Sequence, residues 1–569
     1  MRRRSLAGGA LAAALLTACA EPAPPPNVLV ISIDTLRRDH VSAYGYARRT
    51  TPRIDQLAAD GVLYLDATST SNWTLPAHMS LMTGLPPGLH RVEDDGSRLA
   101  GSVQTLAEAF SSAGYATAGV VSHVYLGAGF GFDRGFDLYR SKTDQRAADV
   151  SDQAIAWLKD AGSRPWFLFV HYFDPHWSYD APQPFATRFG PADRRLGSSR
   201  YLLKHLTAED PVPPAAIPQI QRLYDAEIAY ADHHVGRLLD WLRERGQFDR
   251  TVVAVLSDHG EELGDHGSFG HGTHMHGEVT RIPMLLRGPG IEARASGDPV
   301  LLSDLPRTLL RLAGLPVAEQ FRLRAVDGMA GQPDRVVVAE STRWGPKRFA
   351  VRSSSQLLLT GARYSPVGFA LVNGKHKAVR LGTRVLPRAL FDVRSDPAEQ
   401  RNLASGPPTP AAARLEAALG AYLDHSHRGL RLDCSATGGS GEFRAHARLS
   451  GVLIDEPFSI PAATAHFEPS AGKPDVSFGL DLSNTSTAVF FPLAGRPSSV
   501  ALRLVRDGQS FAASVDIPTG GSAIALEFAG DSAPRCSVTA PSLALEVGLA
   551  SSELSEADIE MLRSLGYVE

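Results

Sequence analysis

Three long apolar runs in the first half of the chain lack the alternation of apolar and polar residues that marks a half-exposed strand. They are NVLVISID at residues 27–34, PWFLFVHYF at 165–173 and RTVVAVLSD at 250–258. β-Branched and aromatic residues dominate these runs, which is typical of strands buried on both faces of a parallel sheet. The pattern therefore predicts three buried strands, two of which end directly in an aspartate.

Segments with helical patterning separate these strands. Residues 51–61 predict a helix that stops at a glycine, residues 102–122 predict a helix, a turn and a strand, and residues 218–246 predict a long amphipathic helix. Strands that alternate with helices indicate an α/β fold with a mainly parallel sheet sandwiched by helices. In such folds the functional groups gather at the carboxyl ends of the strands.

The patterning changes after about residue 346. Short apolar runs within residues 346–398 predict a small antiparallel sheet, and residues 410–426 predict the helix that follows it. Residues 430–545 contain alternating runs that predict a separate β-rich, sandwich-like module. The pair Asp507-Gly508 inside this region is a strong signal for a β-hairpin.

The composition is that of an ordinary globular protein, because 43% of the 569 residues are hydrophobic and 21% are charged. The formal net charge is −4 and there is no basic block, so the sequence argues against a nucleic-acid partner. Histidine stands out among the residue types: seven of the 19 histidines fall between His233 and His276. This density suggests metal or phosphoryl-type chemistry, although clustered surface histidines would give the same count.

The N-terminus has the features of an export signal. MRRR is a positive start, and the apolar stretch that follows is too short to span a bilayer. The sequence Leu-Thr-Ala-Cys ending at Cys19 resembles the lipobox of bacterial lipoproteins, which predicts cleavage before Cys19 and lipidation of its thiol. Residues 19–26 would then form a stiff proline-rich tether. The alternative is ordinary signal-peptide cleavage with Cys19 incidental.

These patterns predict an exported protein that a lipid anchors to the bacterial cell envelope, on its periplasmic or outer surface. Its expected segments are a signal peptide at 1–18, the lipidated tether at 19–26, an α/β domain at 27–345, an antiparallel sheet plus helix at 346–429, the β-module at 430–545 and a C-terminal helix at 546–569.

The chain has three cysteines, and two of them bracket the β-module. If Cys19 carries a lipid, Cys434 and Cys536 remain as a pair. In an exported protein we expect these two to form a disulfide. Two independent free thiols are the alternative.

Four polar side chains are expected on one rim of the sheet. Asp34 ends the first strand, Asp258 and His259 end the third, and Thr74 lies at the start of a short helical stretch, TLPAHMSLMTG. A threonine there could simply cap the helix. A hydroxyl at a helix N-terminus is also well placed to act on an anion. Two carboxylates, an imidazole and a hydroxyl can bind a divalent cation, which favours the chemical role.

The chain resembles the sulfatase family of the alkaline phosphatase superfamily from about residue 27 to residue 425. Residues 430–545 fall outside the resemblance. The matching motifs occur in family order and are NVLVISIDTLRRDH, TPRIDQLAADG, TLPAHMSLMTG, GFGFDRGFD, FVHYFDPH, SDHGEELGDHG, TRIPMLLRGPG and ALFDVRSDPAEQRNLA.

The resemblance assigns a metal-binding role to Asp34, Asp258 and His259. It places the nucleophile, which is also a metal ligand, at Thr74. It implies a single divalent cation, for which the family favours Ca²⁺, while the ligand types also suit Zn²⁺ or Mn²⁺. A second metal set is not evident, although Asp174, Asp232, His233 and His234 are available.

Further positions match residues that contact the ester in the family. His176 would touch the oxygens of the ester, and His123 and Tyr125 stand where a lysine and a histidine usually bind the anion. His271 would lie near the leaving oxygen, and either His271 or His123 could protonate it. His78 occupies the arginine position of the family signature, as a substrate-binding residue. His274 and His276 could line the entrance.

Two departures from the family change the expected chemistry. The second aspartate of the first strand end is replaced by Thr35, and the signature position is Thr74 instead of cysteine or serine. Threonine cannot be oxidised to the formylglycine of ordinary sulfatases. A threonine adduct must be cleared by attack of water or an alcohol at the central atom, which favours phosphorus over sulfur.

The leading hypothesis is a metal-dependent hydrolase that cleaves sulfuric or phosphoric esters of a small molecule or a glycan. A phospho-alcohol transferase of the same superfamily is the second hypothesis, and the absence of transmembrane helices for a lipid donor disfavours it. The third is a non-catalytic homologue that binds a glycan or a protein partner. The sequence names no protein partner.

Overall fold

The core of the protein is an eight-stranded sheet with the strand order β11-β2-β10-β7-β1-β6-β4-β5 in the computed structural model. The first predicted strand, β1 (Asn27–Ile33), lies between β6 (Trp166–Tyr172) and β7 (Thr251–Leu256) and runs parallel to both. Antiparallel β10 (Met284–Arg287) interrupts the parallel order beside β7. The predicted α/β fold with a mainly parallel sheet is confirmed. The outer strands are β2 (Val62–Tyr64), β4 (Ala116–Val121), β5 (Leu138–Ser141) and β11 (Arg294–Ser296).

The structure describes the α/β part almost completely and the rest in shorter pieces. The described residues are 24–143, 145–205, 211–322, 335–343, 347–361, 363–364, 367–372, 375–380, 384–385, 389–404, 409–427, 429–435, 442–449, 458–460, 465–467, 474–482, 487–492, 498–517, 523–528, 534–540, 556 and 559. The predicted signal peptide, the lipidation of Cys19 and nearly all of the predicted C-terminal helix lie outside them. Within the described residues, no helix combines the length and the apolar character needed to cross a membrane.

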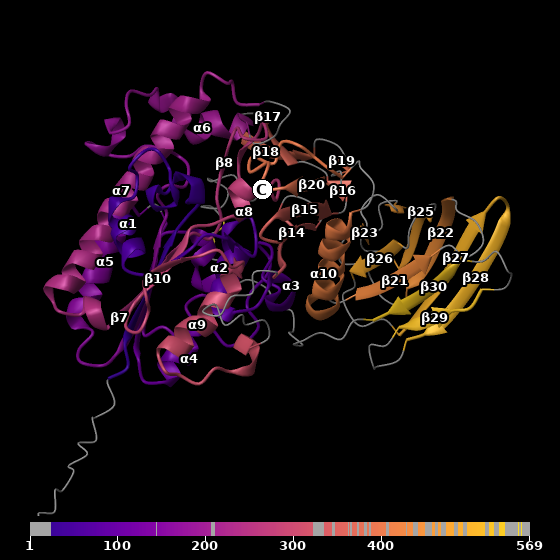
Figure 1. Cartoon of the computed structure of the whole chain (residues 1–569), viewed down its shortest axis with the longest axis horizontal. Coiled ribbons are helices and arrows are strands. Elements are labelled where there is room, and N and C mark those ends of the chain that lie inside the picture. The colour runs from indigo at the N-terminus through magenta and orange to yellow at the C-terminus, as the bar shows by residue number, and fades with distance from the viewer. Residues whose placement is uncertain are drawn as a thin grey trace, which may run out of the picture.

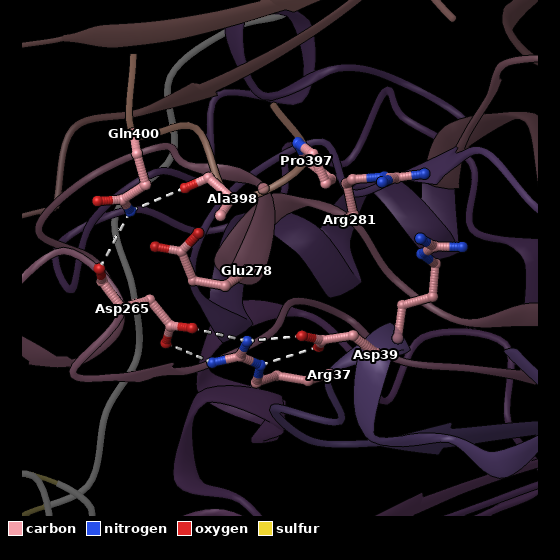
Figure 2. Close-up of a pocket in the computed structure, with 10 residues that line it drawn as sticks. Arg37, Asp39, Asp265, Glu278, Arg281, Pro397, Ala398 and Gln400 are labelled. Carbon is pink, nitrogen blue, oxygen red and sulfur yellow. Dashed lines mark hydrogen bonds and ion pairs between the residues drawn. The ribbon is translucent and has the colours of Figure 1, made fainter. Parts of the chain in front are cut away.

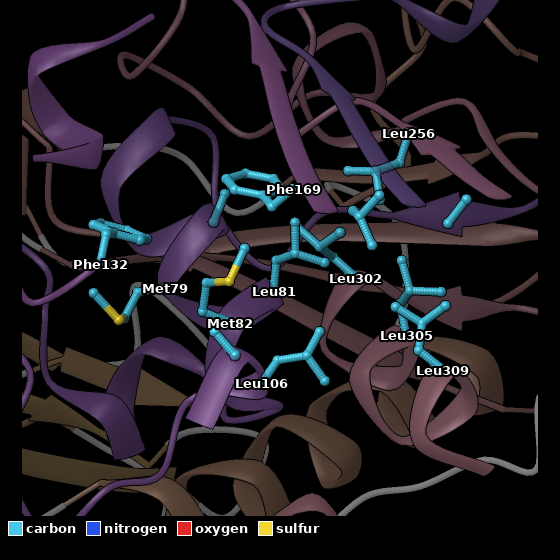
Figure 3. Close-up of a cluster of buried hydrophobic side chains, with 14 of the residues drawn as sticks. Met79, Leu81, Met82, Leu106, Phe132, Phe169, Leu256, Leu302, Leu305 and Leu309 are labelled. Carbon is cyan, nitrogen blue, oxygen red and sulfur yellow. The ribbon is translucent and has the colours of Figure 1, made fainter. Parts of the chain in front are cut away.

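Helices cover both faces of the sheet, and two separate cores fill the space between. Alternate residues of β1 belong to different cores, as the two-residue period of a strand requires: Val28 and Val30 face one side, and Leu29 and Ile31 face the other. The first core contains side chains of α2 (Thr74–Thr83), α4 (Leu106–Ser112) and α9 (Leu305–Leu312) (Figure 3). The second contains side chains of α1 (Pro52–Ala59), α5 (Ala147–Asp160) and α7 (Ile217–Glu244).

A four-stranded antiparallel sheet follows, built from β13 (Val337–Ser341), β14 (Arg348–Arg352), β15 (Gln356–Gly361) and β20 (Ala389–Asp392). Helix α10 (Pro410–Ser426) packs on it through a shared apolar core. The sheet includes β13, which pairs with β14 and precedes residue 346.

Ten strands form two five-stranded antiparallel sheets beyond α10 (Figure 1). One sheet has the order β23-β26-β21-β30-β29 and the other β24-β25-β22-β27-β28. In β22 (Glu442–Leu449) every second side chain is buried, and these side chains belong to a core shared by both sheets. The other strands are β21 (Gly429–Ser435), β23 (Phe458–Ile460), β24 (Ala465–Phe467), β25 (Asp475–Asp481), β26 (Thr487–Pro492), β27 (Ser499–Arg506), β28 (Gln509–Asp516), β29 (Ile524–Leu526) and β30 (Arg535–Thr539).

Two local features of this β-region follow from its sequence. Asp507 and Gly508 join β27 to β28 with φ angles of 50° and 80°, which is the backbone that a two-residue hairpin turn needs. Cys434 and Cys536 lie opposite each other on paired strands and form a disulfide. The structure thus shows both the hairpin and the cysteine pair where the sequence places them.

Candidate active site

The carboxyl ends of β1 and β7 bring three polar side chains together. Asp34 follows β1, and Asp258 and His259 follow β7 by two and three residues. The strands are parallel neighbours in register, so their ends meet at one edge of the sheet. One ligand atom from each side chain lies within 4.8 Å of the others, and all three residues are fully buried.

The carboxylates of this group lie among imidazoles, but several of their oxygens make no hydrogen bond within the part of the chain that the structure describes. Among the described residues, neither side-chain oxygen of Asp34 has a hydrogen bond, nor does Oδ2 of Asp258. Burial raises the pKa of Asp34 to about 7, and the nearby His259 opposes this shift only in part. Buried carboxylates without partners are costly, and a divalent cation would compensate them. His259 donates from Nδ1 to the carbonyl of Gly260 at 2.8 Å, which leaves its Nε2 as the ligand atom. These residues therefore fit a metal ion.

Thr74 joins this group through its hydroxyl. Its Oγ1 lies 3.3 Å from His259 Nε2, which in turn lies 3.3 Å from Oδ2 of Asp258. Thr74 is the first residue of α2, and the N-cap position belongs to Trp73, which makes no side-chain capping bond. The capping role considered for Thr74 is therefore wrong, because its side chain turns toward the strand ends.

His78, one helical turn after Thr74, is fully buried beside the candidate metal ligands. Its Nδ1 lies 3.0 Å from the carbonyl oxygen of Thr74 and 3.3 Å from Oδ2 of Asp258, and its Nε2 lies 2.8 Å from the hydroxyl of Ser32. His78 therefore ties the start of α2 to β1, and its contact with substrate stays a prediction.

Three buried imidazoles, those of His271, His176 and His123, lie beside these groups. The ring centroid of His271 lies 4.3 Å from that of His259 and 5.2 Å from that of His176, and His176 lies 5.9 Å from His123. Burial lowers the pKa of His176 to about 3 and holds the pKa values of His123 and His271 well below their usual range. Neutral imidazoles in a dry site can hold and exchange protons with a bound ester.

Two of these imidazoles are fixed by specific partners. Nδ1 of His271 lies 2.8 Å from Oε1 of the fully buried Glu261. Nδ1 of His123 accepts from the backbone N–H of Tyr125 at 3.0 Å. The Tyr125 hydroxyl accepts from Arg343 at 2.8 Å, and its ring stacks on His123 at 5.3 Å. Tyr125 is therefore held beside His123, and a contact of its own with substrate stays a prediction.

This arrangement matches a known family. The family model described as Sulfatase matches residues 26–315, about half of the chain. The chain belongs to the sulfatase family. It is thus an ester hydrolase of the alkaline phosphatase superfamily.

Relatives in the sulfatase family cover most of this chain. The choline-sulfatase of Rhizobium meliloti (strain 1021) is 26% identical over 461 residues, which are 70% of this chain and 86% of that protein. The Delta 4,5-hexuronate-2-O-sulfatase of Bacteroides thetaiotaomicron is 25% identical over 471 residues, which are 74% of this chain and 94% of that protein.

A solved structure shares the fold. The phosphonate monoester hydrolase of Agrobacterium radiobacter has a TM-score of 0.52 and 20% identity, and the match covers 70% of this chain and 94% of that one.

Within the sulfatase site, Thr35 stands where the family resemblance predicts a second aspartate. Its φ of 55° is unusual for a β-branched residue, and its backbone N–H donates to Oδ1 of Asp258 at 3.3 Å. Thr35 therefore supports one carboxylate through the backbone. The hydrogen bond to Asp258 helps to hold this unusual backbone conformation.

Several residues of the site were not singled out from the sequence. Nε2 of His171 lies 3.3 Å from Oδ2 of Asp34, and His171 pairs with Ser32 across β1 and β6. Glu261 and Arg343 are the others. The signal for His171 was a lone histidine inside an otherwise apolar buried strand, and the signal for Glu261 was an acidic residue two positions after His259.

The residues that were available for a second metal set have other partners. Asp232 accepts from the backbone N–H groups of Arg53 and Ile54 at the start of α1, and Asp174 accepts from the N–H of Ala147 at the start of α5. His233 and His234 lie on α7, away from the strand ends. His274 forms part of a different cluster, described below, and Nδ1 of His276 lies 2.9 Å from Oε2 of Glu399.

Proposed function

We propose that this protein hydrolyses anionic esters, phosphoric esters above all, with Thr74 as the nucleophile. The observation that carries this proposal is the position of the Thr74 hydroxyl, 3.3 Å from His259 Nε2, in a group where several buried carboxylate oxygens make no hydrogen bond with any described residue. A hydroxyl held at such a cluster is available for attack on an electrophilic centre.

Asp34, Asp258 and His259 would hold a divalent cation together with the Thr74 hydroxyl. When bound, the cation lowers the pKa of the coordinated hydroxyl and neutralises negative charge on the ester. The single imidazole among oxygen ligands suits Mn²⁺ or Zn²⁺ as well as the Ca²⁺ expected from the family resemblance.

The chain's own residues supply the remaining steps. Thr74 Oγ1, after releasing its proton to solvent, forms a bond to the central atom while the bond to the leaving oxygen breaks. His176 and His123 hold the non-bridging oxygens. His271 gives its Nε2 proton to the leaving oxygen while Glu261, which burial keeps protonated by raising its pKa, passes a proton to Nδ1. Water then attacks the central atom of the Thr74 ester, the bond to Oγ1 breaks, and one proton of the water returns through His271 to Glu261, which restores the Thr74 alkoxide. Glu261 orients His271 through Nδ1.

The choice of phosphorus rests on how the Thr74 adduct is cleared. A threonine ester has one oxygen on the side-chain carbon, so it cannot collapse to an aldehyde and expel its group. Attack of water at phosphorus is common in metal-dependent enzymes, whereas attack at the sulfur of a sulfate ester is harder. Sulfuric esters remain the second candidate, because the relatives described above carry sulfatase names.

The test compares turnover of bis-nitrophenyl phosphate, nitrophenyl phosphonate and nitrophenyl sulfate by the metal-free protein with Ca²⁺, Mn²⁺ or Zn²⁺ added. Phosphoric or phosphonic esters should be cleaved, and Thr74→Ala should reduce kcat at least about 10³-fold, while Thr74→Ser retains activity. Thr187→Ala, at a residue away from the site, is the control.

Cleavage by Thr74→Ala at the wild-type rate overturns the assignment of Thr74 as the nucleophile. Failure to cleave any of the esters with any metal favours the non-catalytic alternative, and product esters formed only with an added alcohol favour the transferase.

We also propose that the protein acts at the cell envelope on a small-molecule or glycan ester. The Cys434–Cys536 disulfide supports export, because disulfides persist in oxidising compartments. A solved neighbour was captured with its substrate D-glucosamine-2-N,6-O-disulfate, which supports a sugar ester as the class to test. Radiolabelled palmitate should label the wild-type chain and not Cys19→Ser, which should leave the membrane fraction.

A further inference from the structure

A second group of histidines and glutamates lies on the loop that follows β7 and is distinct from the active-site residues. One ligand atom each from Glu262, His266 and Glu278 lies within 4.8 Å of the others. His274 lies next to these three, because its Nε2 contacts Oε2 of Glu262 and its Nδ1 lies 3.8 Å from Oε1 of Glu278. A second imidazole is therefore available beside the two carboxylates and His266.

Neighbouring glutamates send their side chains to different sites. Glu261 contacts His271 of the active site, whereas Glu262, in β8 (Glu262–Leu263), contacts His274. Adjacent residues of a strand point to opposite sides, which explains the separation. Glu262 pairs with Gly270 of β9 (Phe269–Gly270), so a short hairpin fixes its position.

Each member of the group is held by surrounding structure. Oε1 of Glu262 accepts from the backbone N–H groups of His266 at 2.7 Å and Ser268 at 2.8 Å. The residue before His266, Asp265, is clamped by Arg37, whose guanidinium lies between Asp265 and Asp39 (Figure 2). Glu278 lies on α8 (Gly277–Thr280), and its Oε1 is 2.8 Å from Nδ1 of His266. The donor atoms are therefore placed in advance of any ligand.

One member of the group borders a cavity. Glu278 lines a space of about 360 Å³, together with Asp265, Arg37, Arg281 and Gln400 (Figure 2). A water molecule from this cavity could fill an open coordination position at Glu278.

We propose that Glu262, His266, His274 and Glu278 bind a zinc ion. Mixed imidazole and carboxylate donors in this number suit tetrahedral Zn²⁺ and disfavour Ca²⁺, which prefers oxygen. The ion would join the β8–β9 hairpin to α8 and so brace the loop that carries His271. This proposal is independent of the ester chemistry, because none of its four ligands belongs to the active-site group.

The test counts zinc in a chain whose active-site ligands have been removed. The full chain with Asp34→Asn and Asp258→Asn is stripped with chelator, equilibrated with Zn²⁺, desalted and analysed by inductively coupled plasma mass spectrometry. We expect one Zn²⁺ per chain. Adding His266→Gln or Glu278→Gln should weaken zinc binding at least about 10-fold. Adding His233→Gln, at an exposed histidine of α7, is the matched control and should leave it unchanged.

Two results would overturn the proposal. One is the absence of zinc from the stripped and reloaded chain, which would leave the group as an ion-pair network. The other is zinc that persists undiminished in both His266→Gln and Glu278→Gln. If either variant fails to fold by circular dichroism, crystals of the zinc-soaked wild-type chain decide the question. An anomalous peak at the zinc edge between Glu262, His266 and Glu278 supports the site, and its absence refutes it.

Discussion

The contact between Glu261 and His271 makes a quantitative prediction about proton transfer. Glu261 Oε1 lies 2.8 Å from His271 Nδ1, and both side chains are buried. Burial raises the pKa of Glu261 well above its ordinary value, so the carboxyl group is protonated and the contact joins two neutral groups. Glu261→Gln keeps the size of the side chain but removes the acid that passes a proton to the imidazole. A hydrogen bond between neutral groups contributes about 0.5–1.5 kcal/mol, which corresponds to a loss of about 2- to 13-fold in kcat.

The assay compares two leaving groups on otherwise identical phosphate diesters. A nitrophenolate departs without being protonated, whereas an alkoxide needs the proton that His271 supplies. Glu261→Gln should therefore slow the alkyl ester by the full factor and the nitrophenyl ester much less. Glu244→Gln, at an exposed residue of α7, is the control and should affect neither substrate.

The reasoning would be refuted by equal losses on both substrates, or by no loss on the alkyl ester. Equal losses would mean that Glu261 shapes the site without acting on proton transfer. Thermal unfolding of Glu261→Gln accompanies the kinetics, so that a loss caused by partial unfolding is recognised by a lowered Tm.

Three further predictions concern metal, charge and the disulfide. Chelation should abolish turnover and lower Tm, since an ion at 100 times its Kd stabilises the folded state by about 2.7 kcal/mol. Asp34→Asn should make Tm insensitive to the metal of this site. A wild-type Tm that chelation leaves unchanged would contradict the metal centre. Glu340→Gln should destabilise the protein by about 3–5 kcal/mol in urea unfolding, because the buried carboxylate contacts Lys347 and His427 and accepts from Tyr422. Those partners hold the pKa of Glu340 below its ordinary value of 4.5, so the stabilisation from Glu340 is present above that pH and lost as the pH falls. The difference in unfolding free energy between wild type and variant should therefore shrink in acid, and a difference that grows in acid would contradict the prediction. Cys434→Ser with Cys536→Ser should cost the β-region about 2–4 kcal/mol, seen as a lower Tm that reductant no longer changes, whereas reductant lowers the wild-type Tm.

The pattern of residues was sufficient to place the main parts of the active site. Asp34, Asp258 and His259 follow apolar strands, and parallel neighbours bring such residues to one edge of a sheet. Thr74 was singled out because a hydroxyl at a helix N-terminus lies among free N–H groups and is well placed to act on an anion. The hairpin at Asp507-Gly508 was predictable because the turn type depends on two adjacent residues alone.

Other features depended on contacts that no local pattern contains. His78 matched a substrate-binding position, but in the folded chain its nitrogens meet Ser32 and the Thr74 carbonyl. His171 reaches Asp34 only because β6 and β1 pair in one particular register.

The sequence by itself determined the fold class and which strands end in polar side chains, since these follow from periodicity and residue type over short stretches. Only the tertiary structure decided which imidazoles face Thr74 and which face Glu262. Nothing in the local sequence distinguishes the histidines between positions 259 and 276. In the folded chain the adjacent Glu261 and Glu262, at the start of the short β8–β9 hairpin, point to opposite sides, so Glu261 contacts His271 and Glu262 contacts His274.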